Sequence, residues 1–176
     1  MKIILFIIAL FSSSFSGLLA DESPKAVKSE NGMVVSAERF ATMAGVEVLR
    51  EGGNAVDAAV TVGFTLAVTF PRAGNIGGGG FMLVHLKEGT RTVAIDYREK
   101  APNAATRDMF LDKDGNVDND KARSSILSVG VPGTVAGLIL ALEKYGTISL
   151  QRALKPAIEL AEKGFPVSKE LSDSLF

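Results

Sequence analysis

The stretch from residue 54 to residue 102 constrains the fold of this chain more than any other. It begins with a segment that is apolar almost throughout, continues through four consecutive glycines at 77–80, and ends with two strand-like segments. Because a helix that is apolar on all sides is normally buried, residues 55–69 are predicted to form a central helix. The glycines are predicted to mark a close crossing of helix and sheet, since glycine has no Cβ to hold two backbones apart.

Capping residues mark both ends of the central helix. Asn54 precedes it, and Asp57 stands at the third helical position, where a carboxylate complements the helix dipole. Phe70 precedes a proline and therefore ends the helix, because that position disfavours helical backbone. Before the central helix, a short strand at 33–35 and a helix at 37–50 capped by the preceding serine are predicted.

The two segments after the glycines, 81–87 and 91–98, alternate in the manner of antiparallel strands. On the second segment, the alternation places Val93, Ile95 and Tyr97 on one face. The same alternation places Thr92, Ala94, Asp96 and Arg98 on the other face.

Arg98 ends the second strand, on the face opposite to Tyr97. A salt bridge with Asp96 or Glu99 is one interpretation of this arginine. Its position at a strand end directly after the glycine crossing favours the other, an anion site, because the planar guanidinium binds a carboxylate through two parallel hydrogen bonds. His85 lies in the middle of the first strand and is expected to be structural.

The rest of the chain is predicted to be largely helical. A short helix at 106–111 precedes a polar loop, a longer helix opens within 131–134 and closes at 145–146, and an apolar stripe follows from residue 150. Pro156 either kinks that last helix or begins a second one. The final residues repeat a helical pattern without a terminating signal, and the chain is therefore expected to be part of a longer protein.

Composition excludes several classes of function. The chain has 176 residues, of which 47% are hydrophobic, and a formal net charge of −1, which suits one soluble globular domain. Without a basic excess, nucleic acid is not an expected partner. The absence of cysteine excludes disulfides and thiolate chemistry, and a Ser-His-Asp triad would have to rely on the single histidine.

The first twenty residues are predicted to be a secretory signal peptide. A basic start is followed by an apolar core at 3–11 and by Ala20, a small residue at the expected cut. That core is too short to span a bilayer, so no stable membrane anchor is expected. A polar arm at 21–31 and a domain at 32–176 follow, and the mature chain is expected to be exported to the periplasm or secreted.

Neither a cofactor nor a metal is predicted. The glycines at 77–80 precede a strand, whereas a phosphate-binding loop opens a helix and carries a lysine. The acidic loop that starts at Asp112 has Val117 and Arg123 at the places where a calcium loop needs glycine and glutamate.

Four motifs occur in one order along the chain: EGGNAVDAA at 51–59, AGNIGGGG at 73–80, DYREKAP at 96–102 and GVPGTVAG at 130–137. Together they resemble the gamma-glutamyltransferase family, also called glutathione hydrolases, and the resemblance extends from about residue 32 to the end. It implies an α/β (α+β) fold, part of the four-layered αββα sandwich of N-terminal-nucleophile hydrolases. This chain would be the N-terminal part of the large subunit.

The resemblance also implies a chemistry. Such enzymes are made as precursors that cut themselves into a large and a small subunit, and the new N-terminal threonine of the small subunit attacks the gamma-glutamyl amide of glutathione, with its own amine as base. The glutamyl group then passes to water or to an amino acid. The arginine of the matching motif, Arg98 here, holds the α-carboxylate of the glutamyl group.

No stretch of these 176 residues resembles the self-cleavage site or the nucleophilic threonine. Thr134 and Thr147 lie at a helix start and in a turn, so no catalytic residue is assigned and the chain alone is expected to be inactive. Two alternatives stay open: a related acylase that acts on another acyl group, and a truncated, non-catalytic exported protein. Arg98 favours the gamma-glutamyl function over the acylase because it supplies a carboxylate receptor.

Overall fold

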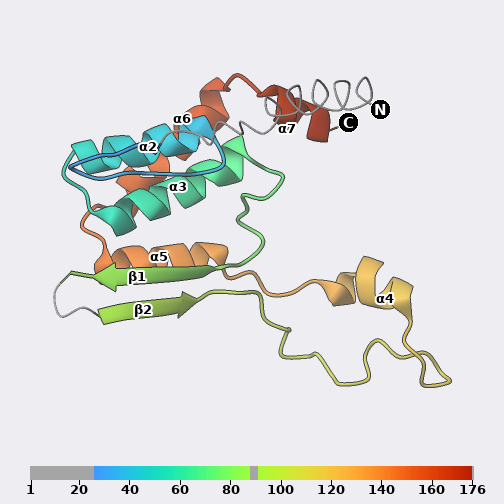
Figure 1. Cartoon of the computed structure of the whole chain (residues 1–176). Coiled ribbons are helices and arrows are strands. Elements are labelled where there is room, and N and C mark those ends of the chain that lie inside the picture. The colour runs from blue at the N-terminus through green and yellow to red at the C-terminus, as the bar shows by residue number, and fades with distance from the viewer. Residues whose placement is uncertain (1–25, 88–90, 176) are drawn as a thin grey trace, which may run out of the picture. The chain divides into compact units, whose positions relative to one another are not determined.

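The computed structural model describes residues 26–87 and 91–175 (Figure 1). The predicted signal peptide and the predicted turn between the two strands lie outside the described residues. The chain divides into two units, Met1–Asn31 and Gly32–Phe176, and the fold reported below is that of the second. Its described elements are α2 (Arg39–Arg50), α3 (Ala55–Thr69), β1 (Phe81–Leu86), β2 (Arg91–Asp96), α4 (Asn119–Ser124), η2 (Ile126–Ser128), α5 (Thr134–Tyr145), α6 (Leu150–Lys163) and α7 (Lys169–Ser174).

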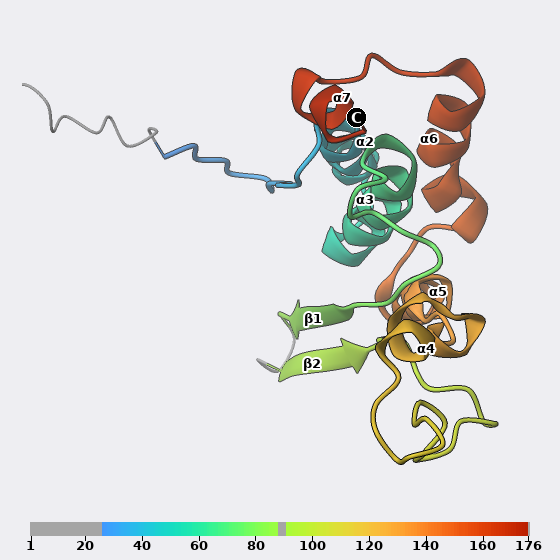
Figure 2. The same cartoon turned by 90° about the vertical axis from the view of Figure 1, so that its right-hand side faces the viewer.

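Helix α3 is the central helix that the sequence predicts, with the predicted bounds. It contacts α2, α5 and α6, and most of its side chains are buried (Figures 1 and 2). The capping box at its start is also confirmed: the Asn54 N–H donates to Asp57 Oδ2 at 2.8 Å, and the Asp57 N–H donates to Asn54 Oδ1 at 3.0 Å. Two N–H groups at the helix start thereby have partners.

Strands β1 and β2 form the predicted antiparallel hairpin, with Phe81 opposite Asp96 and Leu86 opposite Arg91. Strand β2 ends at Asp96, so Arg98 lies two residues beyond the strand and not in it as predicted. Val84 and Ile95 point inward and join the apolar core that α3, α5 and α6 supply. The other face is open: Leu83 is 75% exposed. Within the described residues, the sheet has these two strands and helices cover one of its faces.

The start of α2 differs from the prediction. The carboxylate of Glu38 caps this helix by accepting from the N–H groups of Phe40 and Ala41, at 2.9 and 3.0 Å. The Ser36 hydroxyl instead donates to the Glu38 carbonyl, two residues ahead of it. The longer glutamate reaches the free N–H groups from the cap position, so the helix begins two residues later than expected. The strand predicted at 33–35 is wrong as well, since these residues belong to no strand or bridge.

The helix predicted at 106–111 is wrong. Backbone bonds there join residues three apart, as in turns, and Leu111 then pairs with Val117 in an isolated bridge that reverses the chain. Helices α4 and η2 lie in what the sequence predicted to be loop. Both are short and expose most of their residues, so they carry little of the apolar periodicity that identifies a helix.

The later helices follow the prediction closely. Helix α5 ends at Tyr145, and α6 runs without a break through Pro156 to a left-handed Gly164 at φ 76°. Of the two interpretations of this proline, the start of a second helix is wrong, because α6 is a single helix from Leu150 to Lys163. Among the described residues, none of the helices is both long enough and apolar enough to cross a membrane.

Candidate substrate-binding site

Three segments meet where β2 ends: the glycine loop 75–80, residues 97–100 and residues 130–134. We call them together the glycine junction. The Tyr97 N–H donates to the Gly80 carbonyl at 3.0 Å, which extends the hairpin by one pair. The N–H groups at the start of α5 close the junction by donating to the Gly78 carbonyl, that of Gly133 at 2.8 Å and that of Thr134 at 3.0 Å. Backbone groups from three distant parts of the sequence are thus bonded together.

Gly78, Gly79 and Gly80 are required by close contact and not by an unusual backbone angle, whereas a Cβ on Gly77 would meet nothing within 4 Å. None of residues 77–80 is among the glycines with left-handed φ. A Cβ on Gly79 would lie 2.7 Å from both the Cα of Arg98 and the N of Glu99, and a Cβ on Gly133 would overlap the Tyr97 carbonyl oxygen. The predicted close crossing is confirmed, and its partner on the sheet side is the backbone of Arg98.

Tyr97 fills the space beside the junction. Its ring lies against Gly80 and Gly137, where a Cβ would come into collision with ring carbons. Burial raises the pKa of the Tyr97 hydroxyl. The residue directly before Arg98 is therefore held by a side chain that packs between two glycines.

The Arg98 side chain itself is open to solvent, with 72% of it exposed. Its Nε lies 4.0 Å from the Glu99 carboxylate, and its backbone N–H donates to Asp96 Oδ1 at 3.0 Å. An exposed ion pair of this length contributes little, about 0–1 kcal/mol. Of the two interpretations, the salt bridge exists only as this weak ion pair with Glu99. The guanidinium therefore retains N–H donors for a ligand.

A cavity of about 490 Å³ lies beside Arg98. Besides Arg98, the cavity is lined by charged, apolar and small residues: Glu99, Lys100, Ala101, Pro102, Ala105, Met109, Phe110, Leu127, Ser128, Val129 and Gly130. Two cations, Arg98 and Lys100, against one carboxylate, Glu99, leave the lining with a net positive charge, and together with its apolar side chains this suits an organic anion. The loop from 101 to 110, where the predicted helix is missing, thus forms part of this wall.

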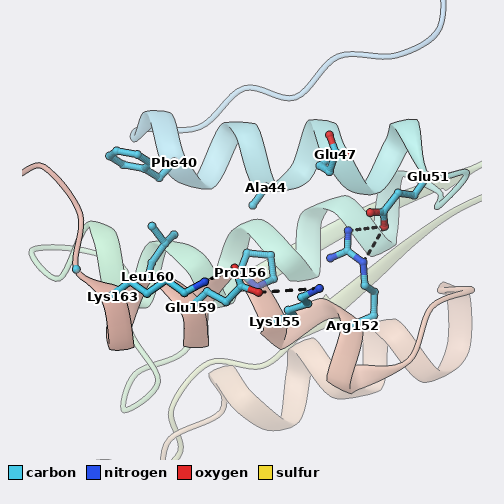
Figure 3. Close-up of a pocket in the computed structure, with 11 residues that line it drawn as sticks. Phe40, Ala44, Glu47, Glu51, Arg152, Lys155, Pro156, Glu159, Leu160 and Lys163 are labelled. Carbon is cyan, nitrogen blue, oxygen red and sulfur yellow. Dashed lines mark hydrogen bonds and ion pairs between the residues drawn. The ribbon is translucent and has the colours of Figure 1, made fainter.

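A second cavity, of about 400 Å³, lies between α2 and α6 (Figure 3). Five of its charged side chains pair with one another, and the sixth, Glu47, pairs with Arg50 outside the lining. Arg152 donates to Glu51 through two nitrogens, and Glu159 lies 3.9 Å from Lys155 and 3.4 Å from Lys163. It shares no residue with the cavity at Arg98. We assign this groove to the packing of the two helices.

The remaining residues singled out in the sequence have local partners. His85 Nδ1 lies 3.0 Å from the hydroxyl of Thr92, its register partner on β2, on the exposed face of the hairpin. Asp112 Oδ1 accepts from the N–H groups of Asp114 and Asn116, and the bonds to the loop backbone, that of Asn116 foremost, lower the pKa of Asp112. Across residues 26–87 and 91–175, no cluster of three or more His, Asp or Glu residues suits a metal ion.

Asp57 does more than cap α3. It is fully buried and also accepts from the loop between α5 and α6: from the Thr147 N–H at 2.8 Å, the Thr147 hydroxyl at 2.6 Å and the Ile148 N–H at 3.3 Å. Burial alone would raise the pKa of Asp57, but the hydrogen bonds from Thr147, Asn54 and Ile148 together lower it. Thr147 is therefore engaged in this structural contact.

Sequence reasoning missed two residues of the glycine junction. Asn75 Oδ1 accepts from the Gly78 N–H at 2.9 Å and from the Thr134 hydroxyl at 2.6 Å. Asn75 and Thr134 each belong to a motif that the sequence shows, but they lie 59 positions apart. A single sequence has no signal for such a pair, because spacing predicts only contacts within one element.

The described residues thus form a mixed helix-and-sheet unit with a solvent-exposed arginine shortly after the end of a strand. The model of the gamma-glutamyltranspeptidase family matches residues 41–175. The chain therefore belongs to this family, which is a family of enzymes. Membership confirms the predicted fold class, part of an α/β (α+β) N-terminal-nucleophile hydrolase.

Individual relatives agree. The chain is 58% identical over 149 residues to the glutathione hydrolase proenzyme of Escherichia coli strain K12, an alignment that covers 85% of this chain and 26% of the relative. It is 53% identical to the proenzyme of the same name from Pseudomonas sp. strain A14, over 96% of this chain and 29% of the relative. The crystal structure of Helicobacter pylori gamma-glutamyltranspeptidase matches with a TM-score of 0.80 and 49% identity, over 86% of this chain and 43% of that one. The chain thus spans between a quarter and a third of the length of the curated relatives named here.

Proposed function

We propose that this chain is the substrate-recognition part of a proenzyme that hydrolyses or transfers the gamma-glutamyl group of glutathione and related compounds. The relatives are named glutathione hydrolase proenzymes, and the similarity runs through the motif that contains Arg98. The observation that carries the proposal is the guanidinium of Arg98, which is open to solvent beside a cavity while its backbone is fixed in the glycine junction.

In this proposal, Arg98 holds the α-carboxylate of the glutamyl group. Its planar fork donates two parallel hydrogen bonds to the two carboxylate oxygens, which places the γ-carbonyl at the far end of the glutamyl side chain at a fixed distance. Lys100, which also lines the cavity, adds positive charge. The nucleophile comes from the small subunit of the same precursor, whose N-terminal threonine takes the acyl group while the amide nitrogen leaves with a proton.

The test uses the full-length protein that carries this sequence. Purified and processed, it is expected to release the aniline from a gamma-glutamyl anilide and to do so far more slowly with a 4-aminobutyryl anilide, which differs only in lacking the α-carboxylate. Residues 32–176 expressed alone are expected to release none. Equal turnover of the two anilides would favour the alternative of an acylase with another acyl group, and no turnover of either by the full-length protein would favour a non-catalytic protein.

We also propose that the protein is exported, with cleavage close to Ala20. The support is the basic start and apolar core of the first twenty residues. N-terminal sequencing of the protein recovered outside the cytoplasm is expected to begin near Asp21. Recovery of a soluble exported form that still begins at Met1 would contradict this.

A further inference from the structure

Asn75 and Thr134 join the glycine loop to the start of α5 through their side chains. The Thr134 hydroxyl donates to Asn75 Oδ1, which also accepts from the Gly78 N–H. Thr134 is only 7% exposed, so its hydroxyl bonds away from bulk water, where a hydrogen bond is electrostatically stronger. Beside this link, the Gly78 carbonyl accepts from two N–H groups of the helix start. Side chains and backbone therefore fix the loop to α5 at the same place.

The glycine loop contacts the backbone of Arg98 directly, so fixing the loop also restricts the position of Arg98. Gly79 follows Gly78 and approaches the Cα of Arg98 so closely that a Cβ would stand 2.7 Å from it. Gly133 also approaches this stretch, at the carbonyl oxygens of Tyr97 and Arg98. The Arg98 backbone is thus in contact with both the glycine loop and the start of α5, and a displacement of either moves the guanidinium.

We infer that Asn75 and Thr134 are positioning residues for carboxylate recognition: their mutual hydrogen bond fixes the Gly78–Gly79 backbone, and through it the place of the Arg98 guanidinium. Neither side chain is required to touch the substrate. The inference deepens the proposed function and rests on it, since Arg98 must bind the substrate carboxylate for its place to matter.

Steady-state kinetics of the full-length protein test this with Thr134→Val, which keeps the shape of the side chain and removes the hydroxyl. For the gamma-glutamyl anilide, we expect KM to rise about threefold to tenfold, the effect of one lost hydrogen bond, while kcat changes less than about twofold. The 4-aminobutyryl anilide has no carboxylate for Arg98, so its kcat/KM is expected to stay the same. Thr134→Ser restores the hydroxyl and is expected to recover most of the loss.

Asn75→Ala breaks the same bond from the other residue and is expected to act in the same direction, so the test survives if one variant fails to fold. Thr65→Val is the matched control: it removes another buried threonine hydroxyl, which donates to the Thr61 carbonyl inside α3. We expect Thr65→Val to leave KM and kcat unchanged for both anilides. In an Arg98→Ala background, Thr134→Val is expected to have no further effect, because the group that it positions is gone.

An unchanged KM in both Thr134→Val and Asn75→Ala, an equal loss on the two anilides, or additive effects of Thr134→Val and Arg98→Ala would each overturn the inference. Failure of the proposed function has a different signature: the wild-type protein would not discriminate between the two anilides, or Arg98→Ala would match it.

Discussion

Two charged residues of this chain, Asp57 and Arg98, lie in motifs of similar prominence but in opposite environments. Asp57 is fully buried and accepts hydrogen bonds from the start of α3, at Asn54, and from the loop between α5 and α6, at Thr147. The Arg98 side chain is 72% exposed and has one distant partner in Glu99. The carboxylate has its bonding capacity filled by the fold, whereas the guanidinium has a fixed backbone and free donors.

The difference shows how a fold separates stability from recognition. A buried ion is tolerated only when hydrogen bonds replace its hydration, and the environment of Asp57 does this completely. A residue that recognises a ligand needs the reverse: a backbone held in place and a side chain with free hydrogen-bond donors, which the ligand then occupies. In this molecule the glycines hold the backbone in place at Arg98, since they let three backbones meet without side chains between them.

The largest expected effect is the loss of substrate recognition on changing Arg98 in the full-length protein. Arg98→Lys keeps the charge but loses one of two parallel hydrogen bonds, each worth about 1.5–3 kcal/mol. The expected decrease in kcat/KM for the gamma-glutamyl anilide is therefore about tenfold to a hundredfold, and larger for Arg98→Ala. Circular dichroism and the urea midpoint are expected to be unchanged, because the side chain is exposed.

The 4-aminobutyryl anilide is the control for Arg98, and its kcat/KM is expected to be the same in wild type and both variants. Self-cleavage of the precursor is also expected to survive, because its own peptide bond has no glutamyl carboxylate. Variants that match wild type on the gamma-glutamyl substrate would show that Arg98 is a surface residue with a weak ion pair and no recognition role.

Asp57 is expected to show the converse, a loss of stability. Asp57→Ala removes the acceptor of three part-buried N–H groups, those of Asn54, Thr147 and Ile148. At about 1–3 kcal/mol for each unsatisfied group, we expect the free energy of unfolding to fall by about 3 kcal/mol or more. Urea titration of the full-length protein measures this. If the protein that remains folded has a changed preference between the two anilides, the separation of the two regions is wrong.

A smaller loss of stability is expected at the glycine junction. Gly79→Ala places a Cβ against the backbone of Arg98, which has no flexible end to move aside, and overpacking of this kind costs about 1–3 kcal/mol. Gly77→Ala is the matched control, since a Cβ there meets nothing within 4 Å. It is expected to stay within about 0.5 kcal/mol of wild type. Similar urea midpoints for the two variants would contradict the close crossing.

The sequence predicted those features that depend on neighbours in the chain. The start of α3 and the role of Asn54 and Asp57 follow from a capping pattern of four residues, its end follows from the proline after Phe70, and the face that Val93 and Ile95 share on β2 follows from simple alternation. The same reasoning failed at 106–111, where the pairing of Leu111 with Val117 outweighs a helical pattern, and at α2, where two cap residues competed.

The sequence predicted Arg98 as the key residue of the candidate site, but it did not predict the contacts that hold Arg98 in place. Arg98 was identified from its position after the glycines and from the family resemblance. The contacts that fix it join residues far apart in sequence, such as Asn75 with Thr134 and Lys100 with Val131. Likewise, the position of Asp57 at the start of a helix indicates a cap, but nothing in the sequence indicates its bonds to Thr147 on a loop 90 residues away.

The smallest expected effect is a dependence of stability on pH that belongs to Asp57. Its hydrogen bonds hold the pKa of Asp57 in the folded state below the ordinary value of 3.8. Between the two values, the unfolded chain binds the proton and the folded chain does not, so stability rises with pH in that window. The contribution is fully present above the ordinary value and is lost as the pH falls through the folded pKa.

Asp57→Asn isolates this contribution, because the amide does not titrate and the other acidic residues remain. Asp112, whose pKa is lowered as well, acts in the same direction in both proteins and cancels in the comparison. The urea midpoint of the wild type is expected to fall from pH 6 to pH 3 by more than that of Asp57→Asn, while Arg98→Ala follows the wild type. Parallel pH profiles for wild type and Asp57→Asn would mean that the carboxylate of Asp57 is no better bonded in the fold than in water, and the contrast between the two charged residues would then rest on burial alone.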